Sequence, residues 1–340
     1  MKKITIVLAF LISLSTVYSQ GTNKAGTSAA QFLKIGVGAK EMAMAGASAG
    51  LVDNVSAMYW NPAGMVSVNR LSIAATHTNW FADLQHNYFG IVIPISDDHA
   101  VGINATVLSM GKMEITNEYN PKGTGEFFEA SDFVIGVTYS ARLVDFFSFG
   151  GTVKYVTQSI YSESASAIAL DLGTKLNTGF AGIKIGMAFT NFGSKMKLEG
   201  RDLQKTYDPN PTNASNTGVK SYLSTEEWEL PINFKVGIGW DLVGPYDAMA
   251  INGEHRVKFA IDANHPNDAR ENIATGIEYT WRNLLSFRTG YHFNDDVRNW
   301  VMGMGINWQV QSSVRFMIDY AYASLEKLGE VHIFGIQIGF

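Results

Sequence analysis

From Arg70 onward the sequence is a series of segments, each about ten residues long, in which apolar residues alternate with polar residues or glycine. In the segment "INFKVGIGWDL", for example, Phe234 and Trp240 fall on one face and Lys235 and Asp241 on the other. A side-chain period of two belongs to a β-strand, in which successive side chains point to opposite faces. This feature constrains the chain most, because a sheet built from such segments has one apolar face and one polar face.

The alternation favours a membrane barrel over a soluble sandwich. A sandwich also alternates, but its outer face is polar and its aromatic residues do not gather at strand ends. Here several aromatic residues, among them Trp281, Trp300, Trp308 and Tyr322, lie near segment ends, where membrane barrels carry aromatic girdles. No run beyond the N-terminus approaches the ~18 apolar residues of a membrane helix. We therefore predict an all-β transmembrane fold, an antiparallel outer-membrane β-barrel.

Fourteen strands are predicted, an even number that suits a closed antiparallel barrel. Their approximate bounds are 70–78, 87–96, 99–109, 128–140, 146–159, 166–177, 183–191, 231–242, 247–261, 270–281, 284–293, 299–310, 312–323 and 331–340. The connections alternate between long ones, such as the roughly 39 residues from "NFGSKM" to "TEEWEL", and short ones, such as "SDD", "WRN" and "QVQ". Such barrels have long extracellular loops and short periplasmic turns, so we expect both termini in the periplasm and the long loops outside.

The two ends of the sequence predict export to a bacterial outer membrane. Lys2 and Lys3 precede the apolar run "ITIVLAFLISLSTV", which at about fourteen residues is too short to span a bilayer. We interpret residues 1–19 as a signal peptide that is cleaved before Gln20. The last ten residues, "VHIFGIQIGF", alternate as far as Phe340, as expected of a strand that closes a barrel against the first one. A terminal aromatic strand also resembles the signal by which outer-membrane proteins are handed to their assembly machinery.

Residues 20–69 precede the predicted barrel (70–340), so their location relative to the barrel has to be predicted separately. They are rich in glycine and alanine but also contain Phe32, Met42, Met58 and Trp60. The segment could hang in the periplasm or fill the lumen. Because its large apolar side chains require burial, we favour a hatch that plugs the lumen.

A family resemblance begins at "DNVSAMYWNPAGM". Its Asn61, Pro62, Ala63 and Gly64 resemble the N-terminal hatch motif of FadL-type outer-membrane proteins, which are fourteen-stranded barrels with a plugged lumen. The preceding stretch "FLKIGVGAKEMAMAGASAG" looks more like the PorV/PorQ branch of that superfamily, found in Bacteroidetes. Two further stretches, "TNFGSKMKLEG…ELPINFKVGIGW" and "GIEYTWRNLLSFRTGY", agree with this resemblance.

The resemblance implies one of two functions. PorV-like proteins are similar to shuttle subunits of the type IX protein secretion system, which bind the large translocon barrel and the C-terminal signal domains of exported proteins. We take this as the main expectation, with outer-membrane lipid as the other partner. The alternative is a FadL-like transporter for hydrophobic small molecules. A structural barrel without cargo is a third possibility.

Two sets of residues are candidates for function. Aromatic residues in the long loops favour contact with a protein partner; the candidates are Trp80, Phe81, Tyr119, Phe127, Tyr207 and Trp228. The charges expected on the lumen face have mixed signs, which favours internal pairing, because an unpaired buried charge costs several kcal/mol. If the turn in "WRNLL" is centred on Asn283, Glu278 and Arg288 lie opposite each other and form a lumen ion pair.

The sequence contains no enzymatic motif. It has neither Gly-x-Ser-x-Gly nor His-Glu-x-x-His, and Gly36 and Gly38 lack the third glycine and the βαβ context of a dinucleotide site. We therefore predict no enzyme, no catalytic residues and no cofactor. The net charge of −5, without a basic run, indicates no nucleic-acid partner.

A metal site is also not expected. The chain has no cysteine, and its seven histidines are scattered. Only "HRVKFAIDANHPND" brings His255, His265, Asp262 and Asp268 near one another, and their spacing is not that of a ligand set. We interpret the two aspartates and His265 as part of a solvated loop.

Overall fold

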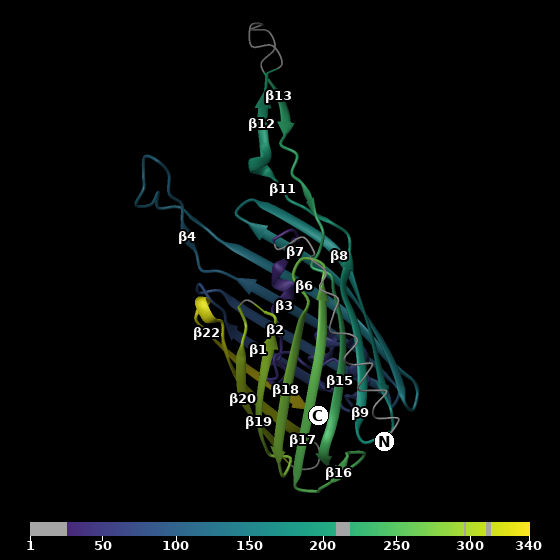
Figure 1. Cartoon of the computed structure of the whole chain (residues 1–340). Coiled ribbons are helices and arrows are strands. Elements are labelled where there is room, and N and C mark those ends of the chain that lie inside the picture. The colour runs from purple at the N-terminus through teal and green to yellow at the C-terminus, as the bar shows by residue number, and fades with distance from the viewer. Residues whose placement is uncertain (1–25, 209–217, 296, 311–313) are drawn as a thin grey trace.

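The computed structural model describes residues 26–208, 218–295, 297–310 and 314–340, and its main body is a closed antiparallel barrel (Figure 1). Each barrel strand pairs with the next, and the last pairs with the first. The strands are β1 (Ser72–Asn79), β2 (Gln85–Ser96), β3 (His99–Ser109), β6 (Ala130–Val144), β7 (Phe147–Ile160), β8 (Glu163–Asn177), β9 (Ile183–Gly193), β15 (Asn233–Gly244), β17 (His255–Pro266), β18 (Asn272–Trp281), β19 (Leu285–Phe293), β20 (Trp300–Val310), β21 (Val314–Ser324) and β22 (Glu330–Gly339). The prediction of a fourteen-stranded barrel is confirmed.

The seam of the barrel explains why the final strand alternates to its end. β22 pairs with β1 from Ser72↔Gly339 to Asn79↔His332, so neither strand leaves a free backbone edge. On β22, Val331 and Ile333 are buried inside, whereas Phe334 and its outward neighbours are exposed. The exposed face is apolar because lipid, not water, surrounds an outer-membrane barrel.

The two ends of the barrel differ, and we name them by their connections. The short-turn end carries the connections 97–98, 145–146, 178–182, 245–254 and 282–284. The long-loop end carries the two longest connections, 110–129 and 194–232, together with shorter ones such as 161–162. From the long-loop end, two extensions project beyond the wall (Figure 1). Their short elements are β4 (Met113–Glu114), β5 (Phe127–Phe128), β10 (Met196–Lys197), β11 (Glu199–Gly200), η4 (Arg201–Leu203), β12 (Gln204–Tyr207), β13 (Val219–Tyr222) and β14 (Glu227–Trp228). The connection between β21 and β22 contains η5 (Glu326–Leu328).

One predicted strand begins in the wrong place. We expected the ninth strand over 247–261, but β17 spans His255–Pro266. The apolar alternation of Met249 and Ile251 imitates a strand, yet only the short β16 (Ala250–Ile251) forms there, parallel to β15. Asn252 and Gly253 then interrupt the strand conformation before β17 begins. The turn is longer than predicted, and β17 reaches further toward the long-loop end.

The segment before β1 lies inside the barrel as a plug, which we define as residues 26–71. Its helical turns are η2 (Gln31–Lys34), α2 (Ala39–Met42), α3 (Ala57–Trp60) and η3 (Pro62–Ser67). The apolar side chains of the plug form a buried core with inward residues of the wall, among them Val92, Val301 and Ile333. Lumen burial supplies the hydrophobic stabilisation that such short turns cannot provide by themselves. Among the described residues, no helix is both long enough and apolar enough to cross a membrane.

The described plug runs the length of the lumen. Ser28 bridges to Glu229 at the long-loop end, whereas Phe340 hydrogen-bonds Leu71 at the short-turn end. The predicted signal peptide and the N-terminal residues after it fall within residues 1–25, outside the described residues. The expectation that both termini share one side of the membrane therefore stays a prediction.

Paired glycines on the lumen face let the plug backbone touch the wall. Gly150 and Gly173 are partners across β7 and β8, and a Cβ on either would lie 2.2–2.4 Å from Asn61 or Pro62. Gly276 and Gly290 are partners across β18 and β19, and a Cβ on either would lie 2.5–2.6 Å from Met44. These separations are far below van der Waals contact, so glycine is required there for close backbone approach.

Candidate functional site

The hatch motif is the main anchor of the plug. Asn61 is fully buried, and its side-chain amide donates to the carbonyl oxygens of Ala49 (2.8 Å) and Thr174 (3.0 Å). Its side-chain oxygen accepts from the backbone N–H of Ala63, and Pro62 begins η3 with a backbone that has no N–H to satisfy. Asn61 thus uses both donors and its acceptor to join two parts of the plug to β8.

Asp262 is a second anchor, and its position corrects our interpretation of a solvated loop. It lies on the lumen face of β17 with none of its surface exposed. One carboxylate oxygen accepts from the backbone N–H groups of Ser48 and Ala49, both at 2.9 Å. The Lys235 ammonium lies 3.9 Å from the same oxygen. The sequence interpretation was wrong because β17 extends five residues past its predicted end.

Asp268 is a third anchor, in the connection after β17, and it too is buried. It accepts from Gln31 at 2.7 Å and Lys34 at 3.0 Å, and also from the Ser28 hydroxyl. Burial by itself would raise the pKa of this carboxyl, but the hydrogen bonds from the plug outweigh it and lower the pKa below its ordinary value. The anchor therefore holds the first described residues of the plug at the long-loop end.

No metal centre emerges from the histidines of this region. His265 pairs instead with Glu271 at 3.1 Å, and His255 hydrogen-bonds Tyr279. Across the described ranges, no group of three or more histidine and acidic side chains could hold a metal ion. Both aspartates of the motif serve as acceptors for plug groups.

A network of charged side chains on β17, β18, β19 and β21 joins the barrel wall to the plug. Glu278 lies directly opposite Arg288, and the Arg288 Nε donates to Glu278 at 2.5 Å. The same guanidinium donates to Asp319 on β21 at 2.6 Å. Lys258 lies 3.9 Å from Glu278 and 3.6 Å from Asp53 of the plug. Removing one member of such a buried network typically costs 3–5 kcal/mol, because its partner is left uncompensated.

Between the plug and the long-loop end lies a cavity of about 620 Å³, which we call the upper cavity. Most of its lining is apolar or aromatic; the principal residues are Phe32, Leu33, Ile35, Met42, Tyr59, Trp60, Trp80, Phe81, Leu84, Leu108, Leu325 and Leu328. Polar side chains also line it, among them five cations, those of Lys34, Lys154, Lys235, Arg270 and Arg298. Within the described part of the chain, all but Arg270 lie within ion-pair distance of a carboxylate. The Lys235 ammonium lies 4.3 Å from the centre of a Trp60 ring, a cation–π contact. His292 Nδ1 and Asn233 Oδ1 are buried, with no hydrogen-bond partner among the residues that the structure describes.

Comparison with known structures identifies the fold. The CymD monoaromatic hydrocarbon channel matches with a TM-score of 0.58 and 13% identity, covering 90% of this chain and 98% of that chain. The Ralstonia pickettii toluene transporter TbuX matches with a TM-score of 0.57 and 13% identity over the same shares. A Pseudomonas aeruginosa FadL homologue gives 0.50 and 12%, covering 94% and 98%. The chain has the fold of a FadL-type outer-membrane barrel.

Sequence comparison gives no finer identification. No protein-family model matches the sequence, and the search of curated proteins returns no match. Nothing in the structural likenesses supports the PorV/PorQ assignment, and at 13% identity or less they carry the fold alone. A role in type IX secretion is therefore a proposal, as is transport.

The six loop aromatics fall into two groups in this FadL-like barrel. Trp80 and Phe81 turn inward, pack against the plug core and line the upper cavity, so they do not form an outward surface as we expected. The remaining candidates are exposed on the extensions of the long-loop end, with Tyr119 at 91%; they are Tyr119, Phe127, Tyr207 and Trp228. Both residues begin the five-residue connection between β1 and β2.

Sequence reasoning missed the residues that organise the lumen. Asp262 has the same parity in β17 as Lys258 and Ala260, so alternation could have placed it on the lumen face. No local pattern distinguishes Asp268, whose partners are more than 230 residues away. The contact of Lys235 with Trp60 is equally non-local.

Proposed function

We propose that this FadL-like barrel takes up hydrophobic small molecules across the outer membrane, and that they bind in the upper cavity. The observation that carries the proposal is the apolar lining of a cavity of about 620 Å³ at the mouth of a plugged barrel. Cavities of roughly 300–1,000 Å³ with mainly apolar walls and few polar groups are typical ligand sites. The long-loop end would then face the exterior, and no catalytic step is involved.

The walls of the cavity suit a ligand with a large apolar surface. Each Å² of apolar surface removed from water contributes roughly 25 cal/mol, so an aromatic molecule gains several kcal/mol by entering. The unpartnered Asn233 Oδ1 could accept a hydrogen bond from a polar substituent, and His292 Nδ1 could accept or donate one according to its tautomer. Two of the structural neighbours are named for toluene or monoaromatic hydrocarbons, which makes toluene a suitable first probe.

A partition measurement tests this proposal. The protein in lipid nanodiscs is dialysed against labelled toluene beside empty nanodiscs, and the excess bound per barrel is measured. Phe81→Lys places a charge in the cavity lining, and Tyr207→Lys is the matched control, an aromatic-to-lysine change on an exposed extension. We expect a saturable excess that falls at least fivefold in Phe81→Lys alone. No excess in the unaltered protein, or equal loss in both variants, would refute the proposal.

A second candidate function is binding of protein partners, namely a type IX translocon barrel or exported proteins with C-terminal signal domains. The observation that favours it is the pair of extensions beyond the barrel wall, with exposed Tyr119, Phe127, Tyr207 and Trp228 (Figure 1). Aromatic residues that project in this way are common at protein interfaces. Gentle purification from the native membrane should yield a very large barrel or such exported proteins, and the double variant Tyr207→Ser/Trp228→Ser should lose them. Retention by the variant would contradict this function.

A further inference from the structure

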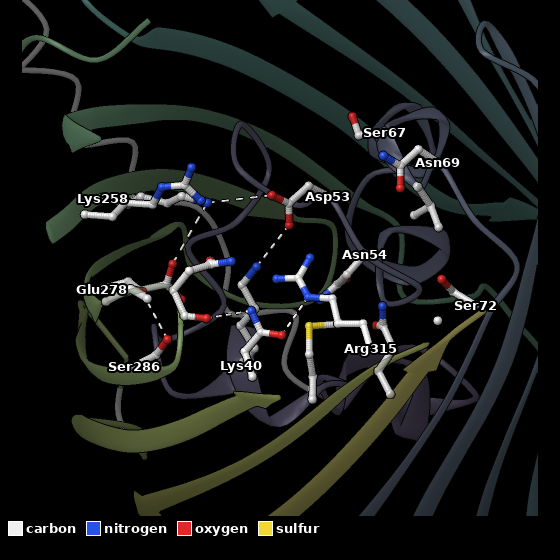
Figure 2. A pocket seen from close by; sticks show the side chains of 18 of the residues that line it. Lys40, Asp53, Asn54, Ser67, Asn69, Ser72, Lys258, Glu278, Ser286 and Arg315 are labelled. Carbon is white, nitrogen blue, oxygen red and sulfur yellow. Dashed lines mark hydrogen bonds and ion pairs between the residues drawn. The ribbon is translucent and has the colours of Figure 1, made fainter. Parts of the chain in front are cut away.

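A second cavity, of about 590 Å³, lies on the other side of the plug, at the short-turn end. We call it the lower chamber. Its walls come from the plug and from most strands of the barrel, including β8, β17, β18, β19 and β21. They are mostly polar and charged, whereas those of the upper cavity are mainly apolar. Figure 2 shows Lys40 and Asp53 of the plug near its centre, with Lys258 and Glu278 on one side and Arg315 and Ser72 on the other.

Part of the charge in the lower chamber is balanced. Three carboxylates of the buried network, those of Asp53, Glu278 and Asp319, face three cations, those of Lys40, Lys258 and Arg288. Two more cations near the turns have acidic partners of their own: Lys184 pairs with Asp241 at 2.7 Å, and Arg142 pairs with Asp98 at 3.5 Å.

Four cations are left over. Arg70, Lys175, Arg256 and Arg315 line the chamber, and within the described ranges no carboxylate lies at ion-pair distance from any of them. Among the described lining residues, the one remaining acid is Asp145, in a turn at the rim. The chamber therefore carries an excess of positive charge, in walls of low dielectric that strengthen its field.

The nearest acid cannot neutralise this excess. Asp53 attracts Arg315, but its two oxygens are already held by Lys40 at 3.0 Å and Lys258 at 3.6 Å. Burial by itself would raise the pKa of Asp53, yet the lysines that face it hold that pKa well below its usual range. Arg70 and Arg256 repel the Arg315 guanidinium. Several cations thus share one carboxylate.

The free cations retain unused donors. Arg315 donates to Asn307 at 2.6 Å, and Lys175 donates to the Val52 carbonyl at 2.8 Å. An arginine has five N–H donors and a lysine three, so most remain available to a ligand. Ser67 and Asn69 of the plug add neutral donors to the same chamber.

We propose that the lower chamber is a binding site for a multivalent oxyanion of the phosphate class. Such a ligand matches several cations at once, accepts many hydrogen bonds, and suits the planar fork of arginine. The site is separate from the upper cavity and does not depend on the transport of hydrophobic molecules. Free phosphate and a phosphate ester share this chemistry.

Calorimetric titration of the detergent-purified full chain tests the proposal, with inorganic pyrophosphate as the probe at low ionic strength. We expect saturable binding near one equivalent, at least tenfold weaker in Arg256→Gln and in Arg315→Gln. Arg282→Gln is the matched control, because its guanidinium is at the same end of the barrel but does not line the chamber and pairs with Glu254 at 3.0 Å; its affinity should change less than threefold. Heat-modifiable migration on gels verifies that each variant forms a barrel.

Further arms distinguish the sources of the anion. If inorganic phosphate binds more tightly than glycerol 3-phosphate, the natural ligand is the free ion. If glycerol 3-phosphate binds more tightly, the natural ligand is a phosphate ester. Either result supports the proposal. Absence of pyrophosphate binding, equal loss in Arg282→Gln, or binding of an oligoglutamate peptide in place of phosphates would overturn it. Toluene partition should be unchanged in Arg256→Gln, so failure of one proposal can be told from failure of the other.

Discussion

Replacing Asp262 by asparagine should release the middle of the plug while leaving the barrel intact. The Asp262 carboxylate accepts two backbone hydrogen bonds from Ser48 and Ala49, and its charge faces Lys235. Asparagine keeps the shape of the side chain but removes the charge, and half of its polar end is a donor. The strand hydrogen bonds of β17 with β15 and β18 do not involve this side chain.

The expected cost follows from the bonds that are weakened. Both bonds go to one oxygen, which the asparagine carbonyl can replace in position but not in charge. A hydrogen bond to a charged group contributes about 1.5–3 kcal/mol and a neutral one about 0.5–1.5 kcal/mol, so each of the two bonds is weakened by roughly 1 kcal/mol. Lys235 also loses the carboxylate closest to it. We expect the plug to be destabilised by about 3 kcal/mol, which at 1.36 kcal/mol per factor of ten corresponds to more than a hundredfold increase in its open population.

The chain offers a direct assay because it has no cysteine. Ser48→Cys introduces one thiol at a position that is 4% exposed, so a maleimide reagent can reach it only when the plug opens. When opening and closing are fast, the labelling rate follows the open population. The Asp262→Asn variant in this background should label about a hundredfold faster than the Ser48→Cys parent.

A surface ion pair supplies the control. Asp98→Asn removes the acidic partner of Arg142, a solvent-exposed pair at 3.5 Å that is worth little. Its labelling rate should remain within twofold of the parent. Rates for Asp262→Asn that also stay within twofold would show that the carboxylate does not hold the plug, and the reasoning from its hydrogen bonds would be wrong.

Three further predictions concern the plug and the wall. Gly173→Ala would set a Cβ 2.2 Å from the hatch-motif asparagine and should speed labelling of the buried thiol at least tenfold, whereas Gly151→Ala, whose Cβ has 3.7 Å of space, should not; equal rates would contradict the close approach. The pKa of Asp268 is lowered on folding, so its contribution to stability is complete above the unfolded pKa of about 3.9 and is lost as pH falls further through the folded pKa. Pepsin should therefore cleave the start of the plug increasingly below pH 4 in the unaltered protein, and Asp268→Asn should already be cleaved at pH 4; identical profiles would count against this anchor. Glu278→Cys with Arg288→Cys should form a disulfide on oxidation, since the two residues are directly opposite, and free thiols after oxidation would mean that the register is wrong.

The sequence by itself determined the strands of the barrel wall and which face of each strand meets lipid. A side-chain period of two is a local property, so alternation in segments such as the one around Phe234 is enough to place strands and to separate their lipid face from their lumen face. The turn at Asn283 likewise sets the register that brings Glu278 and Arg288 together. The predicted start of the ninth strand was wrong because Met249 and Ile251 alternate as in a strand, although they lie in the connection 245–254 before β17.

Only the tertiary structure determined how the plug fills the lumen. The plug follows an irregular path, fixed by contacts with residues more than 100 positions away, such as Asn61 with Thr174 and Ser48 with Asp262. No local pattern encodes contacts of that range. The two cavities are the space that this path leaves free, one against apolar side chains and one against cations. Their chemistry depends on how the plug divides the lumen, and that division exists only after the barrel has closed around it.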